Sequence, residues 1–174
     1  GASLTGILAS GIANTPAGNI VAVTAQAAIN ELDTEKMSIA TYDSDGDGVV
    51  DTAEVIVILC RNNTGVTISK MAAVYISGAT GQTPTIALAK ADAEATSSKT
   101  IGVVTADIAN NATGLVALLG ALRGYNTSAF TDGNTLWLSA ATAGGFTATR
   151  PAAPNHAVLI GFVAYSHASN GKIA

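Results

Sequence analysis

Charged residues are scarce in this chain of 174 residues, where they make up 11%, against roughly a quarter in an ordinary soluble domain. Aromatic residues are also few, at 5%, although the hydrophobic fraction is 48%. A disordered chain would be more polar, and a nucleic-acid-binding protein would normally be basic, whereas here 8 Lys+Arg stand against 12 Asp+Glu. The composition indicates a folded protein without a nucleic-acid partner, whose subunits cover their surface with copies of themselves.

Long hydrophobic runs and paired cysteines are absent from the sequence. The best apolar runs, residues 55–60 and 115–122, are far shorter than the roughly 20 residues of a membrane span, so we expect no membrane insertion. The single cysteine, Cys60, cannot form an internal disulfide, and its place after an apolar run predicts a small buried hydrophobic residue. Because the chain starts at Gly1, we expect a trimmed protein or a segment of a longer one.

Acidic residues are concentrated in one loop. Residues 43–54 read DSDGDGVVDTAE, which is the calcium-loop pattern with acids at loop positions 1, 3, 5, 9 and 12 and glycine at position 6. Ca²⁺ binds six to eight oxygens, and Gly48 allows the sharp bend that directs them to one point. The predicted ligands are Asp43, Asp45, Asp47, Val49 through its backbone carbonyl, Asp51 and Glu54.

The alternative for this loop is a solvated acidic turn, because Asp-Gly pairs are ordinary turn formers. A complete EF-hand is not expected, since residues 55–59 after the loop favour a strand and the chain has only one such loop. We therefore predict a structural Ca²⁺ that stiffens the junction between an N-terminal helix and a β domain.

The N-terminal residues 1–40 combine an extended lead-in with one helix. Residues 24–36 are rich in helix formers, and Thr24 is a suitable N-cap. The apolar positions of this helix follow heptad-like steps, and they are Val21, Ala25, Ala28, Leu32 and Ile39. A stripe so thin is marginal in isolation. We expect it to pack against partner chains, and the alternative is a surface helix that lies on its own domain.

Residues 55–174 are predicted to form a β domain, after the helical part (1–40) and the acidic loop (41–54). Short apolar segments alternate with turn-forming clusters, which favours a barrel or a sandwich. The expected strands are residues 55–59, 74–76, 101–104, 136–138 and 158–163, while residues 115–122 are compatible with a helix or a strand. The fold class is thus mainly β.

An internal repeat is visible within the β domain. Residues 74–81 (VYISGATG) resemble residues 136–144 (LWLSAATAG), and Ile-Gly-hydrophobic segments follow at 101–103 and 160–162. Because two pairs of similar segments occur in the same order, we predict two similar halves of about sixty residues. We expect them to form one barrel-like domain with pseudo-twofold symmetry.

Other candidate sites are weaker. His156 and His167 lack nearby ligand partners, so we expect surface or turn positions. No nucleophile motif, phosphate loop or dinucleotide motif occurs, and this favours a protein without catalytic activity. Trp137 and Tyr125 are the possible sugar-stacking residues, but Trp137 is expected to pack in the core because it stands within an apolar strand.

Several stretches resemble tail fibres of tailed bacteriophages. Residues 15–20 (TPAGNI) and 25–36 (AQAAINELDTEK) look like a unit that recurs along trimeric fibre shafts, and the acidic loop at 42–54 resembles loops of such fibres. The β region is similar to a C-terminal fibre domain, and the stretches that carry this similarity are residues 74–78, 99–104, 126–128, 136–139, 154–161 and 166–171.

The resemblance implies a homotrimeric, non-enzymatic fibre or spike of the virion, which binds other virion proteins and contacts a host cell-surface glycan or protein. Two alternatives remain open, a capsid-decorating or head-fibre protein and a secreted bacterial adhesin or surface-filament subunit. A polysaccharide-degrading spike would need paired carboxylates, and Asp92, Glu94, Asp107 and Asp132 show no recognisable pairing.

Overall fold

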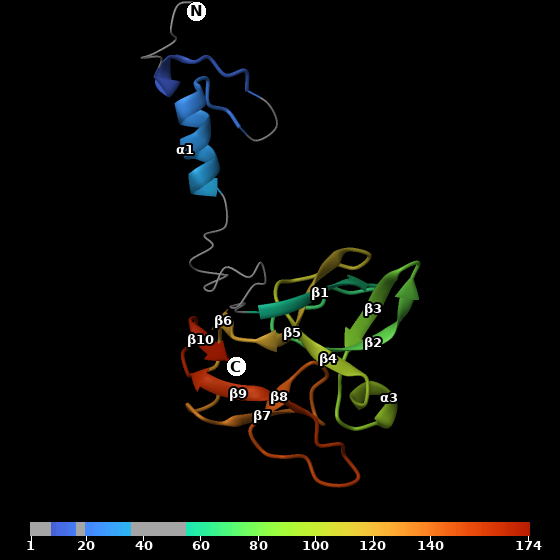
Figure 1. Ribbon diagram of the computed structural model, residues 1–174. Helices are drawn as coiled ribbons and strands as arrows, with labels where there is room; N and C mark the ends of the chain where they lie inside the picture. Colours follow the sequence, from blue (N-terminus) through green and yellow to red (C-terminus); the bar gives the residue numbers. More distant parts are fainter. Residues whose placement is uncertain (1–7, 17–19, 36–54) are drawn as a thin grey trace, which may run out of the picture. The chain divides into compact units, whose positions relative to one another are not determined.

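The computed structural model describes residues 8–16, 20–35 and 55–174, and the protein is mainly β (Figure 1). The chain divides into two compact units, Gly1–Thr52 and Ala53–Ala174, which are described separately below. None of the helices in the described ranges is long and apolar enough to cross a membrane.

The first unit contains a 3-10 turn, η1 (Ala9–Gly11), and the helix α1 (Ala25–Glu35). Thr24 caps the helix as predicted, because its Oγ1 accepts the N–H of Ala27 at 3.2 Å. The lead-in is not simply extended, since Asn14 N–H donates to the Val23 carbonyl at 2.8 Å. The carboxylate of Glu31 on α1 also accepts the N–H groups of residues 21 and 22. The lead-in therefore folds back onto the start of the helix.

The predicted apolar stripe of α1 is only partly covered within this unit. Val21 is 73% exposed and Leu32 is 51% exposed, while Ala25 and Ala28 are half-buried. Ile39, the last position of the stripe, lies outside the described residues. A helix whose large apolar residues remain in water obtains little stability from its own chain.

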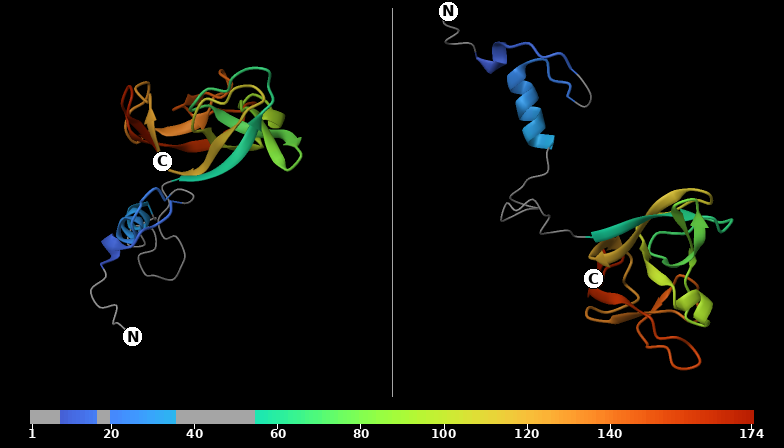
Figure 2. Two further views of the ribbon diagram at one scale, coloured as in Figure 1. Left: turned by 90° about the horizontal axis from the view of Figure 1, so that it is seen from above. Right: turned by 45° about the vertical axis from the view of Figure 1, so that its right-hand side comes forward.

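The second unit begins with a closed five-stranded barrel, with strand order β1-β3-β2-β4-β5 (Figures 1 and 2). Its strands are β1 (Val55–Asn62), β2 (Ala73–Thr80), β3 (Thr83–Leu88), β4 (Thr100–Val104) and β5 (Thr113–Gly120), and the short helix α3 (Glu94–Ser97) precedes β4. The barrel closes through a short parallel contact of β1 with β3 at Arg61 and Asn62. The predicted strands at 55–59, 74–76 and 101–104 are confirmed, and residues 115–120 are strand rather than helix.

A five-stranded sheet follows, with strand order β6-β10-β9-β7-β8. Its strands are β6 (Leu122–Tyr125), β7 (Thr135–Leu138), β8 (Phe146–Thr147), β9 (Leu159–Tyr165) and β10 (Gly171–Ile173). These include the segments predicted at 136–138 and, from Leu159, at 158–163.

Two hydrophobic layers stabilise the second unit. The barrel interior is filled by buried apolar residues that include Val74, Ile86, Val104 and Val116. Outside the barrel, Val103 and Ala117 pack against Leu136, Val163 and Ile173 of the sheet. One face of the sheet therefore covers part of the outer face of the barrel.

The barrel and the sheet repeat one pattern of strand pairing. Read from β1, neighbouring strands of the barrel follow the order β1-β5-β4-β2-β3, which matches β6-β10-β9-β7-β8 strand for strand. The register also repeats, because Val74 faces Gly102 as Leu136 faces Gly161. Each ladder is irregular at the next step, after Val74 in one and after Leu136 in the other. The sequence repeat thus corresponds to a repeat of strand pairing.

The repeated glycines allow two strands to approach closely. A Cβ atom on Gly102 would overlap the backbone carbonyl of Ala117, and one on Gly161 would lie 2.6 Å from the carbonyl oxygen of Ala174. Because backbone atoms cannot move aside as a side chain can, both positions require glycine.

We predict that Gly102→Ala and Gly161→Ala each lower the free energy of unfolding by about 2 kcal/mol, because overpacking forces the strands apart. Gly78→Ala is the matched control, since its Cβ would meet only the Thr85 hydroxyl at 3.3 Å. Denaturant unfolding of the three variants measures the effect. Equal midpoints for all three would contradict it.

Candidate functional site

The predicted metal ligands lie outside the described residues. This holds for all six, Asp43, Asp45, Asp47, Val49, Asp51 and Glu54. In the described ranges, no group of three or more His, Cys, Asp or Glu residues comes together. The calcium site therefore stays a prediction from sequence.

The carboxylates near α3 are engaged with basic side chains. Asp92 forms an ion pair with Lys90 at 2.6 Å, and the hydrogen bond from Lys90 lowers the pKa of this carboxyl group. Glu94 lies 3.2 Å from Nδ1 of His156. These contacts tie together loops on the surface of the second unit.

The other two acidic side chains of the described residues 55–174 bind backbone amides. Asp107 accepts the N–H of Lys70 at 2.7 Å, and Asp132 accepts the N–H of Ser166. In the internal repeat, Lys70 corresponds to Asp132 and Asp107 corresponds to Ser166. The two hydrogen bonds therefore join equivalent positions, but the residue that donates in one half corresponds to the residue that accepts in the other. All four carboxylates thus have separate partners, and none is paired with another.

The second histidine stabilises a turn. Nδ1 of His167 accepts the N–H groups of Ser169 at 3.1 Å and of Asn170 at 2.9 Å. Its ring stacks on Tyr165 with centroids 5.7 Å apart. His167 is therefore a turn residue, as expected from the sequence.

The aromatic candidates are not open stacking platforms. Tyr125 is buried in the layer between barrel and sheet, under the ammonium group of Lys70, and burial raises the pKa of its hydroxyl. Trp137 is half-buried rather than in the core, because alternation along β7 places Leu136 and Leu138 inside. The guanidinium of Arg150 lies 5.6 Å from its ring centre. The expectation of a core position for Trp137 is wrong in this respect.

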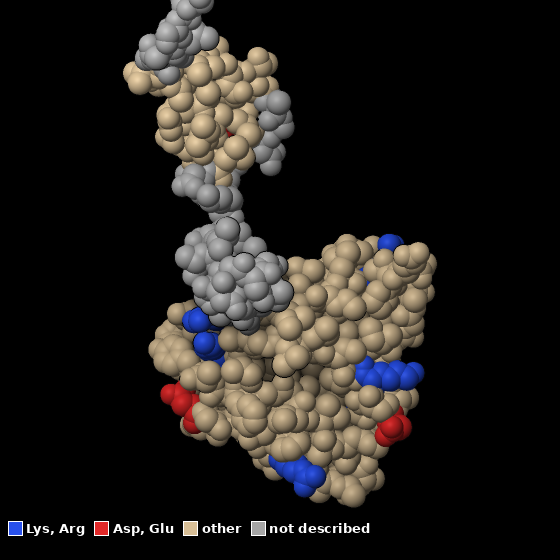
Figure 3. Space-filling view, in the orientation of Figure 1, with Lys and Arg blue, Asp and Glu red and all other residues tan. Residues whose placement is uncertain are grey.

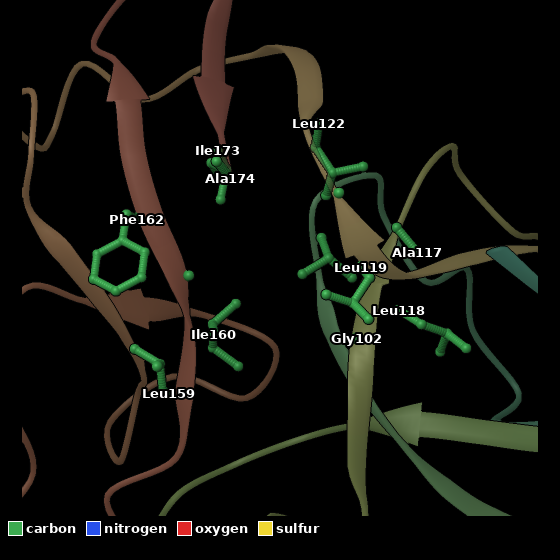
Figure 4. Close-up of a pocket in the computed structure, with 13 residues that line it drawn as sticks. Gly102, Ala117, Leu118, Leu119, Leu122, Leu159, Ile160, Phe162, Ile173 and Ala174 are labelled. Atoms are coloured by element: carbon green, nitrogen blue, oxygen red, sulfur yellow. The ribbon is translucent and has the colours of Figure 1, made fainter. Parts of the chain in front are cut away.

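A groove of about 300 Å³ separates the sheet from the β4–β5 part of the barrel (Figure 4). Its walls include Leu118 and Leu119 of β5 and Leu159 and Ile160 of β9. The lining carries no charged side chain. Such a groove suits an apolar ligand or an apolar protein surface.

Large apolar residues beside this groove are exposed on the β1–β5 ladder. They are Ile56, Val57, Leu59, Leu115, Leu118 and Leu119, with exposed fractions between 41% and 69%. We call this set the β1–β5 apolar surface. Cross-strand pairing joins Ile56 to Leu119 and Leu59 to Leu115. Because alternate residues of β1 point to opposite faces, the set covers both faces of the ladder. A second hollow, whose lining includes Val57, Leu115, Leu122 and the charged Arg123, shares Leu122 with the groove.

A third hollow is polar and lies near the loop after β8. It has a volume of about 390 Å³, and its lining includes Ser139, Thr147, Thr149, Arg150 and Asn155. Hydroxyl, amide and guanidinium groups in one hollow can form hydrogen bonds with a polar ligand.

Sequence reasoning missed the apolar surface. The run VIVILC at residues 55–60 predicts a buried strand, because apolar residues occupy both faces. The structure buries Cys60 but leaves Val57 and Leu59 half in water. The low charge content indicated a surface covered by other subunits, but it did not locate that surface on β1 and β5.

Comparisons with known proteins give no assignment. No protein-family model matches the chain, and a search of curated proteins finds no match.

We predict that Cys60 resists alkylation in the folded protein. The side chain is fully buried and burial raises the pKa of its thiol, which reduces the reactive thiolate. Reaction with iodoacetamide at pH 8, followed by mass spectrometry, is expected to modify Cys60 only after denaturant is added. Rapid modification of the native protein would contradict its burial.

Proposed function

We propose that the chain is a non-enzymatic subunit of a bacteriophage tail fibre or spike, which assembles as a homotrimer in the virion and contacts the host surface. The observation that carries the proposal is the set of large apolar residues left in water in both units, such as Leu32 on α1 and Leu119 on β5. Monomeric proteins rarely leave so much connected apolar surface uncovered. The resemblance of residues 15–20 and 25–36 to units of trimeric fibre shafts indicates that the assembly is a trimeric fibre.

Two features support the absence of catalytic activity. The four carboxylates of Asp and Glu side chains in residues 55–174 each bind a separate partner, so this part of the chain offers no carboxylate pair for glycoside hydrolysis. The groove is apolar along its walls, which carry no acidic or basic side chain. A binding or assembly role fits these surfaces better than a reaction.

Contact with the host is proposed for the β unit. The polar hollow around Arg150 and Asn155 suits a glycan or a polar protein loop on the cell surface. Arg150 already covers the ring of Trp137, so recognition would depend on hydrogen bonds rather than on stacking on that face.

The capsid-decorating protein and the bacterial surface filament remain the alternative functions. Both would also use an apolar subunit interface. Electron microscopy of particles labelled with an antibody against the β unit distinguishes labelling at the tail from labelling at the head. A filament of bacterial origin would label cells in the absence of virus.

The proposed assembly predicts the mass of the native protein. One chain has a mass of 17.2 kDa, and native mass spectrometry is expected to show three times that value. The trimer is expected to persist on dilution to micromolar concentration, because large apolar contacts are slow to dissociate. A stable monomer at every concentration would overturn the fibre proposal.

Bound Ca²⁺ is proposed to stiffen residues 43–54, through the six ligands predicted there. We predict heat release on titration with Ca²⁺ and a lower melting temperature after chelation, since a ligand that binds only the folded state stabilises it. Asp45→Asn combined with Asp47→Asn is expected to abolish both effects. Asp92→Asn, at a carboxylate outside the loop, is the control and is expected to retain them. Absence of heat in the unmodified protein would end the calcium hypothesis.

A further inference from the structure

The β1–β5 apolar surface and the adjoining groove form one connected apolar region. We propose that this region is the contact surface for a second copy of the chain, through which the β units meet. The inference rests on the proposed fibre assembly, because it assigns the subunit contact of that assembly to named strands.

The internal repeat shows that the fold does not require leucines at this surface. Leu59 faces Leu115 across the β1–β5 ladder, and at the equivalent positions of the sheet Arg123 faces Lys172. The equivalence follows from the register. In the β1–β5 ladder the leucine pair is next to the inward-facing pair Ile58–Val116, and in the sheet the charged pair is next to Leu122–Ile173. The same strand geometry therefore accepts charged side chains in one half and carries exposed leucines in the other.

The exposed apolar area is large for a monomer. At somewhat less than the area of an aromatic side chain each, the six residues leave on the order of 500 Å² in water over the two faces of the ladder, within the range of the largest patch on an ordinary monomer. Leu159 and Phe162, at the wall of the groove across from β5, are 51% and 48% exposed and add a little under 200 Å² by the same reasoning. The total approaches the ~800 Å² that each partner buries in a standard protein interface.

The apolar lining of the groove favours a partner surface without charged side chains. None of the residues lining the groove is charged, and Lys, Arg, Asp and Glu lie around the rim of the face that Figure 3 shows. A partner must therefore present an equally apolar and uncharged surface. Another copy of this chain presents such a surface.

The edge of β1 adds a reason for it to be covered. Among the described strands, residues 55–60 pair with β5 alone, because β3 joins β1 only at Arg61 and Asn62. An apolar edge strand that remains open promotes uncontrolled aggregation. A defined contact with a second copy removes this hazard.

The test compares full-length variants by native mass spectrometry and sedimentation over a range of concentrations. Leu59→Glu with Leu115→Lys places an opposite-charge cross-strand pair on the surface, which is compatible with the ladder. Thr80→Glu with Thr83→Lys is the matched control, because it places the same charge pair on the β2–β3 ladder, where Thr80 faces Thr83. Leu119→Asn, at the most exposed residue of the surface, is a milder second variant.

The double variant is expected to dissociate at concentrations at least ~100-fold higher than the unmodified protein, because charge would be buried in an apolar contact. Leu119→Asn is expected to weaken assembly in the same direction with an unchanged melting temperature of the monomer. The control is expected to assemble as the unmodified protein does.

Three results would overturn the inference. If the double variant assembles as tightly as the unmodified protein, the contact lies elsewhere, and the fibre proposal stands without this surface. If the unmodified protein is monomeric throughout, both proposals fail. If it is monomeric and only the double variant loses thermal stability, the surface is covered by the first unit of the same chain.

Discussion

The packing of the sheet on the outside of the barrel is the interaction on which the second unit depends. Val103 and Ala117 leave the barrel surface and enter a layer with Leu136, Val163 and Ile173. A chain with so few aromatic residues has little volume for one large core, and it builds two thin layers instead. Without the sheet, the barrel would expose these residues in addition to those of the β1–β5 apolar surface.

The repeat explains how the two layers are related. Residues that face the barrel interior in the first half, such as Val104 and Val116, correspond to Val163 and Ile173, which face the barrel from the sheet. The inner face of the second half therefore packs on the outer face of the first. Val103, on the outer face of the barrel, is covered by the sheet. Phe162 is the equivalent residue on the outer face of the sheet, and it is 48% exposed.

The sequence predicted the parts of the fold that depend on local chemistry. Thr24 and the helix formers after it specify α1, and the two related segments at 74–81 and 136–144 led to equivalent strands. Strand β3 escaped prediction because Pro84 and its threonines are typical of a turn, although Pro84 pairs with Ala79 near the end of the ladder. The position of Trp137 was mispredicted because a short apolar run does not indicate which of its faces is buried.

The candidate site was less predictable than the fold. The calcium loop can be recognised from residue spacing alone, because its ligands are close together in sequence. It stays a prediction, since residues 43–54 lie outside the described residues. The apolar surface is formed by strands about sixty residues apart, β1 and β5, so no local pattern reveals it. Its members became significant only when Leu59 and Leu115 could be compared with Arg123 and Lys172. The repeat thus supplies an internal reference for what the fold alone would accept.

The central claim is that the apolar surface of the β unit is covered by another copy of the chain. Hydrogen–deuterium exchange of the amides of residues 55–60, measured in the assembled protein and after dilution, tests it most directly. We expect these amides to be protected in the assembly and to exchange faster on dilution, while those of Val74 in the barrel interior remain unchanged. Equal exchange of residues 55–60 at every concentration would contradict the claim.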